Sequence, residues 1–352
     1  MRRILALLCL AATARGIAPP FRAPAPRIID GADARFGEFP WYALFLGNLA
    51  GGNGILYCGA FLAGENVAIT AAHCLGHDDT LIDTARLYFQ SGSAPDGDQR
   101  FTSVFANVLY AAKHPSYTGS QDWSRLYWYD IAVLFLDARI VGVPLPQINI
   151  NSATPKPNDF AVIGFGRTST DGAPSRVLRQ TDVVRYDSTL CEAVWGRSNV
   201  GFDICAVSND AGCRCLPSNP FCASNCDDIC SGDSGGPLFH VDASGKPVVF
   251  GIVSRGWHEC GSGMPSIYSD ISVYGDFVRS ALKSGSDASA PSGPPATASP
   301  PPAKGLPVST VPSPPPEIPP VWSPFGVNYP KTRSCGRGIG MSALFIIVFV
   351  WI

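Results

Sequence analysis

The sequence predicts an all-β protein built as a sandwich or barrel, and three observations carry this prediction. The chain has 36 glycines and 32 prolines, which is typical of a fold with many tight turns. Short runs rich in Val, Ile, Leu and Phe lie between these turns. Their even spacing, without internal repeats, favours strands that pair with one another. The expected strands are residues 56–61, 67–70, 131–136, 160–163, 177–184, 237–239 and 248–253, with one helix at 272–282.

Length and charge limit the classes of function. A chain of 352 residues allows one large domain with appendages. Charged residues make up 15% and the formal net charge is −2, so no basic surface for nucleic acid or an anionic membrane is indicated. The 12 cysteines are spread along the chain without a zinc-ribbon pair, which favours a disulfide-forming compartment.

The N-terminus supports secretion. Two arginines precede a short apolar run, and Ala12-Thr13-Ala14 provides small residues of the kind that signal peptidase recognises. The run is too short to span a bilayer, although a buried helix is an alternative. We therefore expect a signal peptide at 1–16, a proline-rich pro-segment at 17–27 and the main domain at 28–284.

The C-terminal part has a different composition. Residues 285–338 are rich in Ser, Ala and Pro and are expected to form an extended stalk. The apolar segment 339–352 is shorter than the roughly 20 residues that span a bilayer, and Ser334-Cys335-Gly336 offers small residues for a glycosylphosphatidylinositol (GPI) anchor. The spacer 337–342 is short for such a signal. A short membrane span and a C-terminus truncated by faulty gene prediction remain alternatives.

One motif provides a nucleophile and an oxyanion site. In residues 232–237, GDSGGP, glycines on both sides of Ser234 allow a sharp turn. Such a turn presents the hydroxyl of Ser234 and the amides of Gly232 and Ser234 to one substrate carbonyl. A lone G-x-S-x-G could be an ordinary turn, but this longer string is specific.

Two further motifs provide a base and a group that orients it. His73 lies among small residues in TAAHC, residues 70–74, and the chain has only 5 histidines. Asp130 lies at the start of the apolar run 131–136. Alone, Asp130 could be a solvent-facing charge, but acyl transfer to a hydroxyl requires a base and a carboxylate that orients it. The order His73, Asp130, Ser234 therefore predicts a catalytic triad.

These three motifs together resemble those of the chymotrypsin/trypsin family, and the resemblance covers residues 28 to about 282. It is supported by GFG at 164–166 and by the segment 251–256. The family implies two six-stranded antiparallel β-barrels with a C-terminal helix and the triad between the barrels. It also implies that Ser254 hydrogen-bonds the triad aspartate, and that the main chain from Ser254 to Gly256 pairs with substrate.

The resemblance also implies activation by cleavage. The string RIIDG at 27–31 is similar to the family's activation site, where cutting after a basic residue releases an apolar N-terminus. The new α-amino group of Ile28 would form an ion pair with Asp233 and order the oxyanion site. Such a buried pair forms only together with its surrounding contacts and can therefore act as a switch.

Substrate preference is expected to rest on Asp228, six residues before Ser234. In the trypsin branch an aspartate there pairs with Arg or Lys of the substrate. Gly256 keeps one wall of the specificity pocket open. Ser266 and Ile229 replace smaller residues and narrow the pocket, so we expect Arg to be preferred over Lys. Arg255 replaces the family's tryptophan, which leaves the neighbouring subsites open.

The cysteines fall into two groups. The family implies the pairs Cys58–Cys74, Cys191–Cys205 and Cys230–Cys260; a further family pair is absent at both ends, where Phe160 and His240 stand. Four more cysteines lie in an insertion before Asp228: Cys213, Cys215, Cys222 and Cys226. Zinc is disfavoured there because the setting is secretory and no histidine is near. Since Cys213 and Cys215 are too close to bridge each other, each should pair with Cys222 or Cys226.

We therefore expect a secreted or surface-anchored serine endopeptidase, made as a zymogen, with no cofactor and no metal. Its expected partners are protein or peptide substrates, an activating protease and protein protease inhibitors. Membrane attachment is expected only through the C-terminus. A binding protein that lost catalysis and an adhesive stalk protein are the two rival hypotheses. Intact triad motifs disfavour both.

Overall fold

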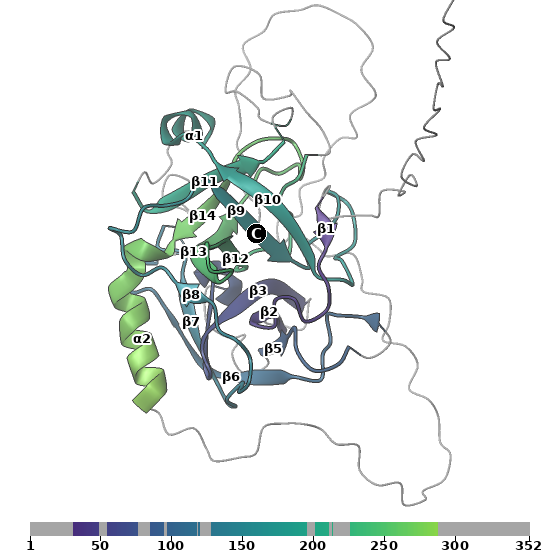
Figure 1. The fold of residues 1–352 in the computed structure, drawn as a ribbon, viewed down its shortest axis with the longest axis vertical. Coiled ribbons are helices and arrows are strands. Elements are labelled where there is room, and N and C mark those ends of the chain that lie inside the picture. The colour runs from purple at the N-terminus through teal and green to yellow at the C-terminus, as the bar shows by residue number, and fades with distance from the viewer. Residues whose placement is uncertain are drawn as a thin grey trace, which may run out of the picture.

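The structure is a computed structural model, and it describes residues 31–48, 55–76, 85–94, 97–117, 119, 128–195, 201–210, 213 and 226–287. Strands dominate these residues (Figure 1). Several expectations lie outside them: the signal peptide, the pro-segment, the cleavage site at Arg27 and Ile28, Cys215 and Cys222, almost all of the stalk, and the apolar C-terminus. Among the described residues, no helix has both the length and the apolar character needed to cross a membrane.

The first barrel closes on itself with six antiparallel strands in the order β2-β3-β4-β7-β6-β5. Its core includes the fully buried side chains of Phe45, Phe61 and Phe89. The strands are β2 (Tyr42–Asn48), β3 (Ile55–Gly64), β4 (Val67–Thr70), β5 (Arg86–Phe89), β6 (Phe105–Lys113) and β7 (Ala132–Leu136).

The second barrel also has six antiparallel strands, in the order β10-β11-β14-β13-β12-β9, and the pairing of β9 with β10 closes it. Two short strands are added outside it: β1 pairs with β10, and β8 pairs in parallel with β13. The strands are β1 (Ala32–Asp33), β8 (Gln147–Ile148), β9 (Asp159–Gly164), β10 (Arg179–Arg185), β11 (Asp203–Ser208), β12 (Pro237–Val241), β13 (Pro247–Arg255) and β14 (Ser266–Asp270). The expected fold of two barrels is confirmed.

Helices are few. A 3₁₀ turn, η2 (Ala72–Leu75), carries His73, and α1 (Ser188–Trp195) lies outside the second barrel. The C-terminal helix begins with the 3₁₀ turn η6 (Ile271–Tyr274) and continues as α2 (Gly275–Asp287), past residue 284 where the domain was expected to end. The Asp270 side chain caps its start by accepting from the Ser272 amide at 3.1 Å. α2 follows the second barrel but contacts β3 and β7 of the first (Figure 1).

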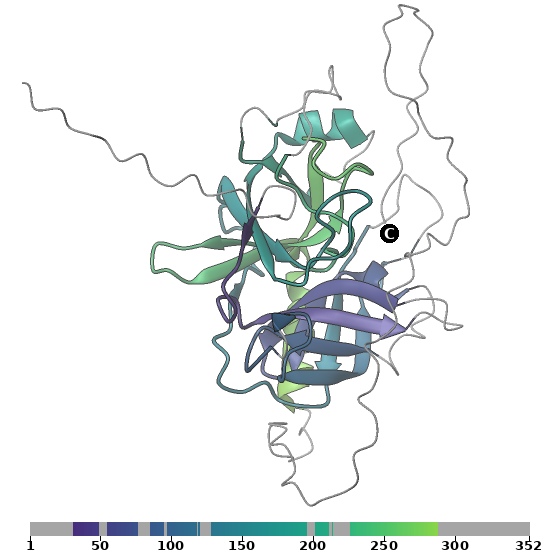
Figure 2. The same cartoon turned by 90° about the vertical axis from the view of Figure 1, so that its right-hand side faces the viewer.

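The two barrels lie one above the other (Figure 2). One cluster of buried apolar side chains includes residues of both barrels. Phe39 and Trp41, just before β2, meet Phe239 of β12 in edge-to-face contacts, with ring centroids 5.5 and 5.4 Å apart. The main chains also join there, because the Gly59 amide on β3 donates to the Ser234 carbonyl at 2.7 Å. These contacts hold the motif segments of both barrels against each other.

Candidate active site

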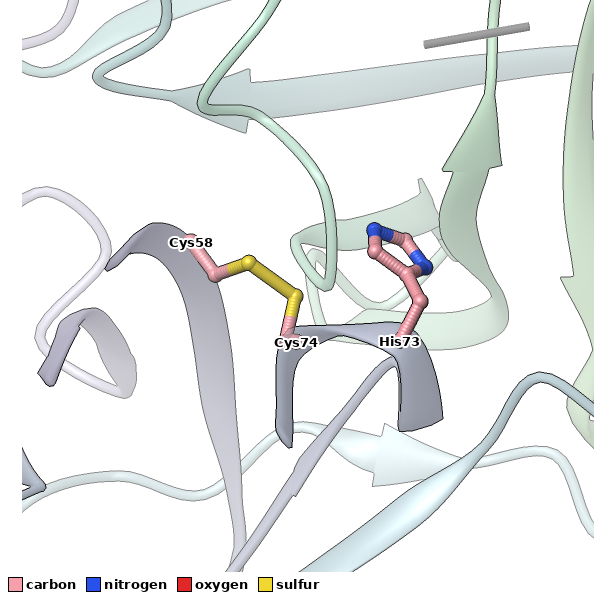
Figure 3. A group of neighbouring side chains, drawn as sticks. All are labelled: Cys58, His73 and Cys74. Carbon is pink, nitrogen blue, oxygen red and sulfur yellow. A yellow bond between two sulfur atoms is a disulfide. The ribbon is translucent and has the colours of Figure 1, made fainter. Parts of the chain in front are cut away.

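His73 is fixed by its neighbours in the chain. It lies on η2, directly after β4, and its residue is 8% exposed. The next residue, Cys74, forms a disulfide with Cys58 of β3 (Figure 3). Cys58, His73 and Cys74 lie close enough to suggest metal ligands, but both sulfurs are in the disulfide and are therefore not available. The disulfide instead ties the histidine turn to the barrel.

Asp130 is fully buried and faces His73. Its Oδ2 lies 2.8 Å from Nδ1 of His73, and its Oδ1 accepts from the His73 amide at 2.9 Å. The Ser254 hydroxyl, from the second barrel, donates to Oδ2 at 2.7 Å. Burial acts to raise the pKa of Asp130, but the charge of His73 and hydrogen bonds from His73 and Ser254 hold that pKa below its ordinary value. The carboxylate is thus ready to orient and stabilise a protonated imidazole.

The turn that carries Ser234 depends on glycine. Gly232 and Gly235 have φ of 100° and 79°, a region that L side chains rarely adopt. The Gly235 amide donates to the Val253 carbonyl at 2.8 Å, which fastens the turn to β13. A narrow cavity lies beside Ser234. Its lining residues are Ile229, Cys230, Ser231, Ser234, Val253, Arg255 and Gly256.

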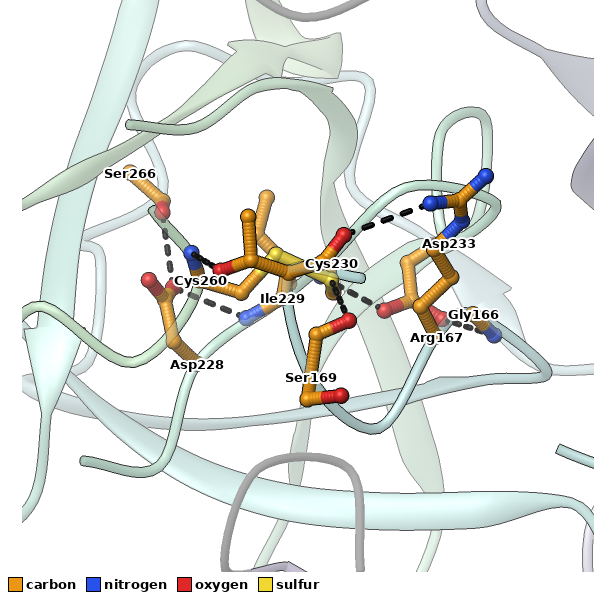
Figure 4. The surroundings of a disulfide bond; sticks show 10 residues. Gly166, Arg167, Ser169, Asp228, Ile229, Cys230, Asp233, Cys260 and Ser266 are labelled. Atoms are coloured by element: carbon orange, nitrogen blue, oxygen red, sulfur yellow. Dashed lines mark hydrogen bonds between the residues drawn. A yellow bond between two sulfur atoms is a disulfide. The ribbon is translucent and has the colours of Figure 1, made fainter. Parts of the chain in front are cut away.

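Asp233, next to Ser234, points away from solvent into the second barrel and is 1% exposed. It accepts hydrogen bonds from the amides of Gly166, at 2.8 Å, and Cys230, at 2.9 Å (Figure 4). A Cβ on Gly164 or Gly166 would overlap its carboxylate. Burial raises the pKa of Asp233 to about 6, against the two amides and the charge of Arg179. Its expected partner, the amino group of Ile28, lies outside the described residues.

Asp228, the residue expected to set substrate preference, is 6% exposed. Its Oδ1 accepts from the hydroxyl of Ser266 and the amide of Ile229, each at 2.8 Å (Figure 4). Among the described residues, its Oδ2 has no hydrogen-bond partner. Burial raises the pKa of Asp228 to about 7, against hydrogen bonds from the Ser266 hydroxyl and from the amides of Ile229 and Gly261. Ile229 lines the cavity beside Ser234, whereas Asp228 does not.

Four disulfides join cysteines within the described residues. The pairs Cys58–Cys74, Cys191–Cys205 and Cys230–Cys260 are present as the resemblance implied. Cys230–Cys260 ties the Ser234 loop to the segment after Gly256 (Figure 4). In the insertion, Cys213 is joined to Cys226, one of the two pairings left open. The strands β9 and β12 run side by side where Phe160 and His240 replace a family pair.

Sequence reasoning missed three residues close to the site. Tyr129, directly before Asp130, has a φ of 60°, and its ring stacks on His114 with centroids 4.9 Å apart. Asp203 on β11 pairs with Arg255 at 3.0 Å, and Trp195 at the end of α1 lies near the same guanidinium. In the sequence, the only signal of the cluster of Arg255, Asp203 and Trp195 was Arg255 in place of the family's tryptophan. Asp203 and Trp195 are distant from Arg255 in sequence.

Two antiparallel barrels that meet around a buried Asp–His pair and a serine turn are typical of serine endopeptidases. A family model described as Trypsin matches residues 28–278. The chain belongs to the trypsin family, and it is a trypsin-like serine endopeptidase.

Curated relatives agree with this family. The chain is 30% identical to Transmembrane protease serine 9 of Rattus norvegicus over 75% of its own length, but it covers 23% of that protein. It is 30% identical to Trypsin-1 of Astacus astacus, over 72% of this chain and 98% of the relative. It is 28% identical to Lectizyme of Glossina austeni, over 74% of this chain and 88% of the relative.

Proposed function

We propose that this endopeptidase is secreted or held at the cell surface and cleaves peptide bonds after Arg, or less readily Lys, through an acyl-enzyme. The observation that carries the catalytic part is the buried contact of Asp130 with Nδ1 of His73, at 2.8 Å. This contact leaves Nε2 of His73 as the nitrogen that takes the proton of Ser234.

The reaction follows from these roles. Oγ of Ser234 attacks the substrate carbonyl while Nε2 of His73 accepts its proton. The negative oxygen is stabilised by the amides of Gly232 and Ser234. His73 then gives its proton to the leaving amine, and the C–N bond breaks. A water molecule then gives a proton to His73 and attacks the acyl carbonyl. The ester bond to Ser234 breaks, the acid product leaves, and His73 returns the proton to Oγ of Ser234. Asp130 stabilises the imidazolium in both steps.

The preference for Arg rests on Asp228. A guanidinium in the pocket would pair with the carboxylate, whose Oδ2 lacks a partner among the described residues. Such a cation also favours ionisation of a carboxyl whose pKa burial has raised to about 7. Ile229 and Ser266 restrict the space. Because Ile229 rather than Asp228 lines the cavity, an apolar P1 residue is the second candidate.

The proposal includes an activating cleavage and the binding of inhibitors. Cleavage between Arg27 and Ile28 by another protease would release an amino group that pairs with Asp233. Protein protease inhibitors would bind as substrates do, along Ser254 to Gly256.

The catalytic proposal is tested by labelling the cleaved enzyme with a fluorophosphonate. We expect label on Ser234 and none in Ser234→Ala. His73→Ala should retain the fold by circular dichroism but lose at least about 10³-fold in kcat, because the triad acts as a unit. Near-normal hydrolysis by His73→Ala would exclude this mechanism.

The specificity proposal is tested with a peptide library varied at P1. We expect Arg first, Lys second, and loss of both preferences in Asp228→Ser. Ser266→Gly should widen acceptance, with Lys gaining most. A wild-type profile led by Ala, Leu or Phe would replace the Arg proposal with the apolar one.

We further propose that Ser334 receives a GPI anchor. Attachment there would also remove Cys335, which has no partner once five disulfides are counted and Cys9 leaves with the signal peptide. Phosphatidylinositol-specific phospholipase C should release the enzyme from cells that express the full chain. Enzyme that resists the phospholipase but leaves when the stalk is cut would indicate a membrane span.

A further inference from the structure

A buried arginine lies beside Ser234 and has no role in the mechanism above. Arg255, the last residue of β13, lines the same cavity as Ser234. Its side chain is 7% exposed, and Nη2 donates to Oδ2 of Asp203 at 3.0 Å. The guanidinium carbon lies 5.9 Å from the ring centroid of Trp195. The side chain is therefore held in place by two other elements, β11 and α1.

One end of this guanidinium is unsatisfied. Among the described residues, Nη1 of Arg255 has no hydrogen-bond partner, although it is shielded from solvent. A buried donor without a partner is destabilising, and more so when the group is charged. Since Asp203 already fixes the other end, a second acceptor could bind without ordering the side chain anew.

The local backbone directs Arg255 away from the triad. A β-bulge between Val253 and Arg255 interrupts the pairing of β13 with β14. Ser254, inside the bulge, turns its hydroxyl to Asp130, whereas Arg255 turns to Asp203. Gly256 follows at the wall of the proposed specificity pocket. A Cβ added to Gly256 would lie 3.3 Å from Oγ of Ser266. A peptide along Ser254 to Gly256 would thus place P1 in the pocket and earlier residues over Arg255.

We propose that Arg255 forms an acid-binding subsite that selects Asp or Glu at one of the positions P2 to P4 of the substrate. The inference rests on the substrate orientation proposed above and adds a second requirement to it. A carboxylate is the acceptor that a guanidinium binds most strongly, because the hydrogen bond is charge-assisted and two parallel bonds are possible. Asp203 reduces the net charge, so the selectivity is moderate and depends on the guanidinium donors.

The test uses the cleaved full-length enzyme and matched fluorogenic peptides, built on whichever P1 residue the enzyme cleaves best. P2, P3 and P4 are each set in turn to Asp, Asn or Leu. At one position we expect kcat/KM for Asp to exceed that for Leu about tenfold or more, with Asn between them. The Asp preference should be lost in Arg255→Gln and partly retained in Arg255→Lys. Asp203→Asn should increase it, because the competing carboxylate is neutralised.

Each contrary result is distinct. Equal rates for Asp and Leu at all three positions in the wild type would overturn the subsite. So would an Asp preference that Arg255→Gln leaves intact, or equal rates for Asp and Asn. Because ratios within one variant are compared, a lower absolute rate in a destabilised variant does not change the outcome. Failure of the Arg preference at P1 would appear in the P1 library and leave this comparison valid.

Discussion

Two buried carboxyl groups near Ser234 have pKa values shifted in opposite directions. Burial acts to raise both, but Asp130 faces the charge of His73, and its pKa falls below the ordinary value. Asp228 is bonded by the neutral groups of Ser266 and Ile229, and its pKa rises to about 7. The groups that face each carboxyl therefore decide its pKa. Asp130 faces His73 within the protein, whereas we infer that Asp228 receives a cation from the substrate.

The first prediction concerns Asp228 and stability. Its pKa lies above the ordinary value of about 3.9, so the folded state binds more protons than the unfolded state between pH 4 and 7. The free energy of unfolding therefore falls as pH rises through this window, and the penalty is complete above pH 7. Asp228→Asn should raise Tm at pH 8, because it removes the cost of burying the ionised carboxylate, up to about 4 kcal/mol in the free energy of unfolding. At pH 4 the two proteins should unfold at closer temperatures.

Thermal unfolding from pH 4 to 8 measures this difference. Ser266→Ala serves as the matched variant: it removes a hydrogen bond that lowers the pKa of Asp228, so the window should extend to higher pH. A Tm difference between wild type and Asp228→Asn that is independent of pH would contradict the shift.

Tyr129 leads to the second prediction. Its φ of 60° costs a non-glycine residue roughly 1–2 kcal/mol. The ring is packed by His114, Phe202 and Tyr274, with centroids 4.9, 5.5 and 6.1 Å away. These contacts hold the strained backbone that aims the next residue, Asp130, at His73. Tyr129→Ala should therefore lower kcat by about tenfold while KM changes little.

Tyr129→Phe keeps the ring and should behave like the wild type. If Tyr129→Ala kept the kcat of the wild type, the ring contacts would have no part in positioning Asp130.

At the scale of elements, the sequence predicted strands that are apolar runs bounded by turns. β4 has the expected bounds, and the other six expected strands are present with shifted ends. β14 was missed because Ser266, Ser269 and Asp270 interrupt its apolar pattern although the strand is fully buried. Burial is tolerated there because Ser266 bonds Asp228, and Asp270 pairs with Lys156 at 2.8 Å. β2 was missed because an apolar run without alternation can also be a helix.

In the site too, some residues follow from local sequence patterns and others do not. The motifs predicted His73, Asp130 and Ser234 as the triad, because triad chemistry leaves a local sequence pattern. The strain at Tyr129 and the contact of Arg255 with Asp203 come from packing between distant elements. No single motif encodes such contacts, so only the structure reveals them.

The third prediction concerns the end of β9. A Cβ on Gly166 would overlap the carboxylate of Asp233, which is buried and cannot move into solvent. Gly166→Ala should therefore displace Asp233, disorder the neighbouring oxyanion site and lower kcat/KM by at least about 100-fold. Gly64→Ala is the matched control, because its nearest neighbour would be Val67 at 3.6 Å. Equal activity of Gly166→Ala and wild type would contradict the role assigned to Asp233.

At the scale of the whole molecule, both barrels contribute to one site. The hydroxyl of Ser254 in the second barrel bonds Asp130 of the first, and the Gly59 amide of the first bonds the Ser234 carbonyl of the second. Any change that shifts one barrel against the other would therefore alter the triad. The segment before β2 is well placed to transmit such a change, since Phe39 and Trp41 pack on Phe239.

The last prediction concerns activation. Residues just after the expected cut are already attached to the second barrel: Asp33 pairs with Arg179 at 2.8 Å, and the Gly31 carbonyl accepts from Arg179 at 3.3 Å. Ile28 lies three residues before Gly31, a reach of roughly 10 Å. Its α-amino group would meet Asp233 and lower the pKa of that carboxyl, which burial has raised to about 6.

Arg27→Gln should therefore remain inert, while active enzyme should begin at Ile28 by N-terminal sequencing. Activity of the cut enzyme should fall at alkaline pH as the amino group loses its proton. Asp233→Asn, cut at the same bond, should stay inactive, and full activity of Arg27→Gln would exclude the switch.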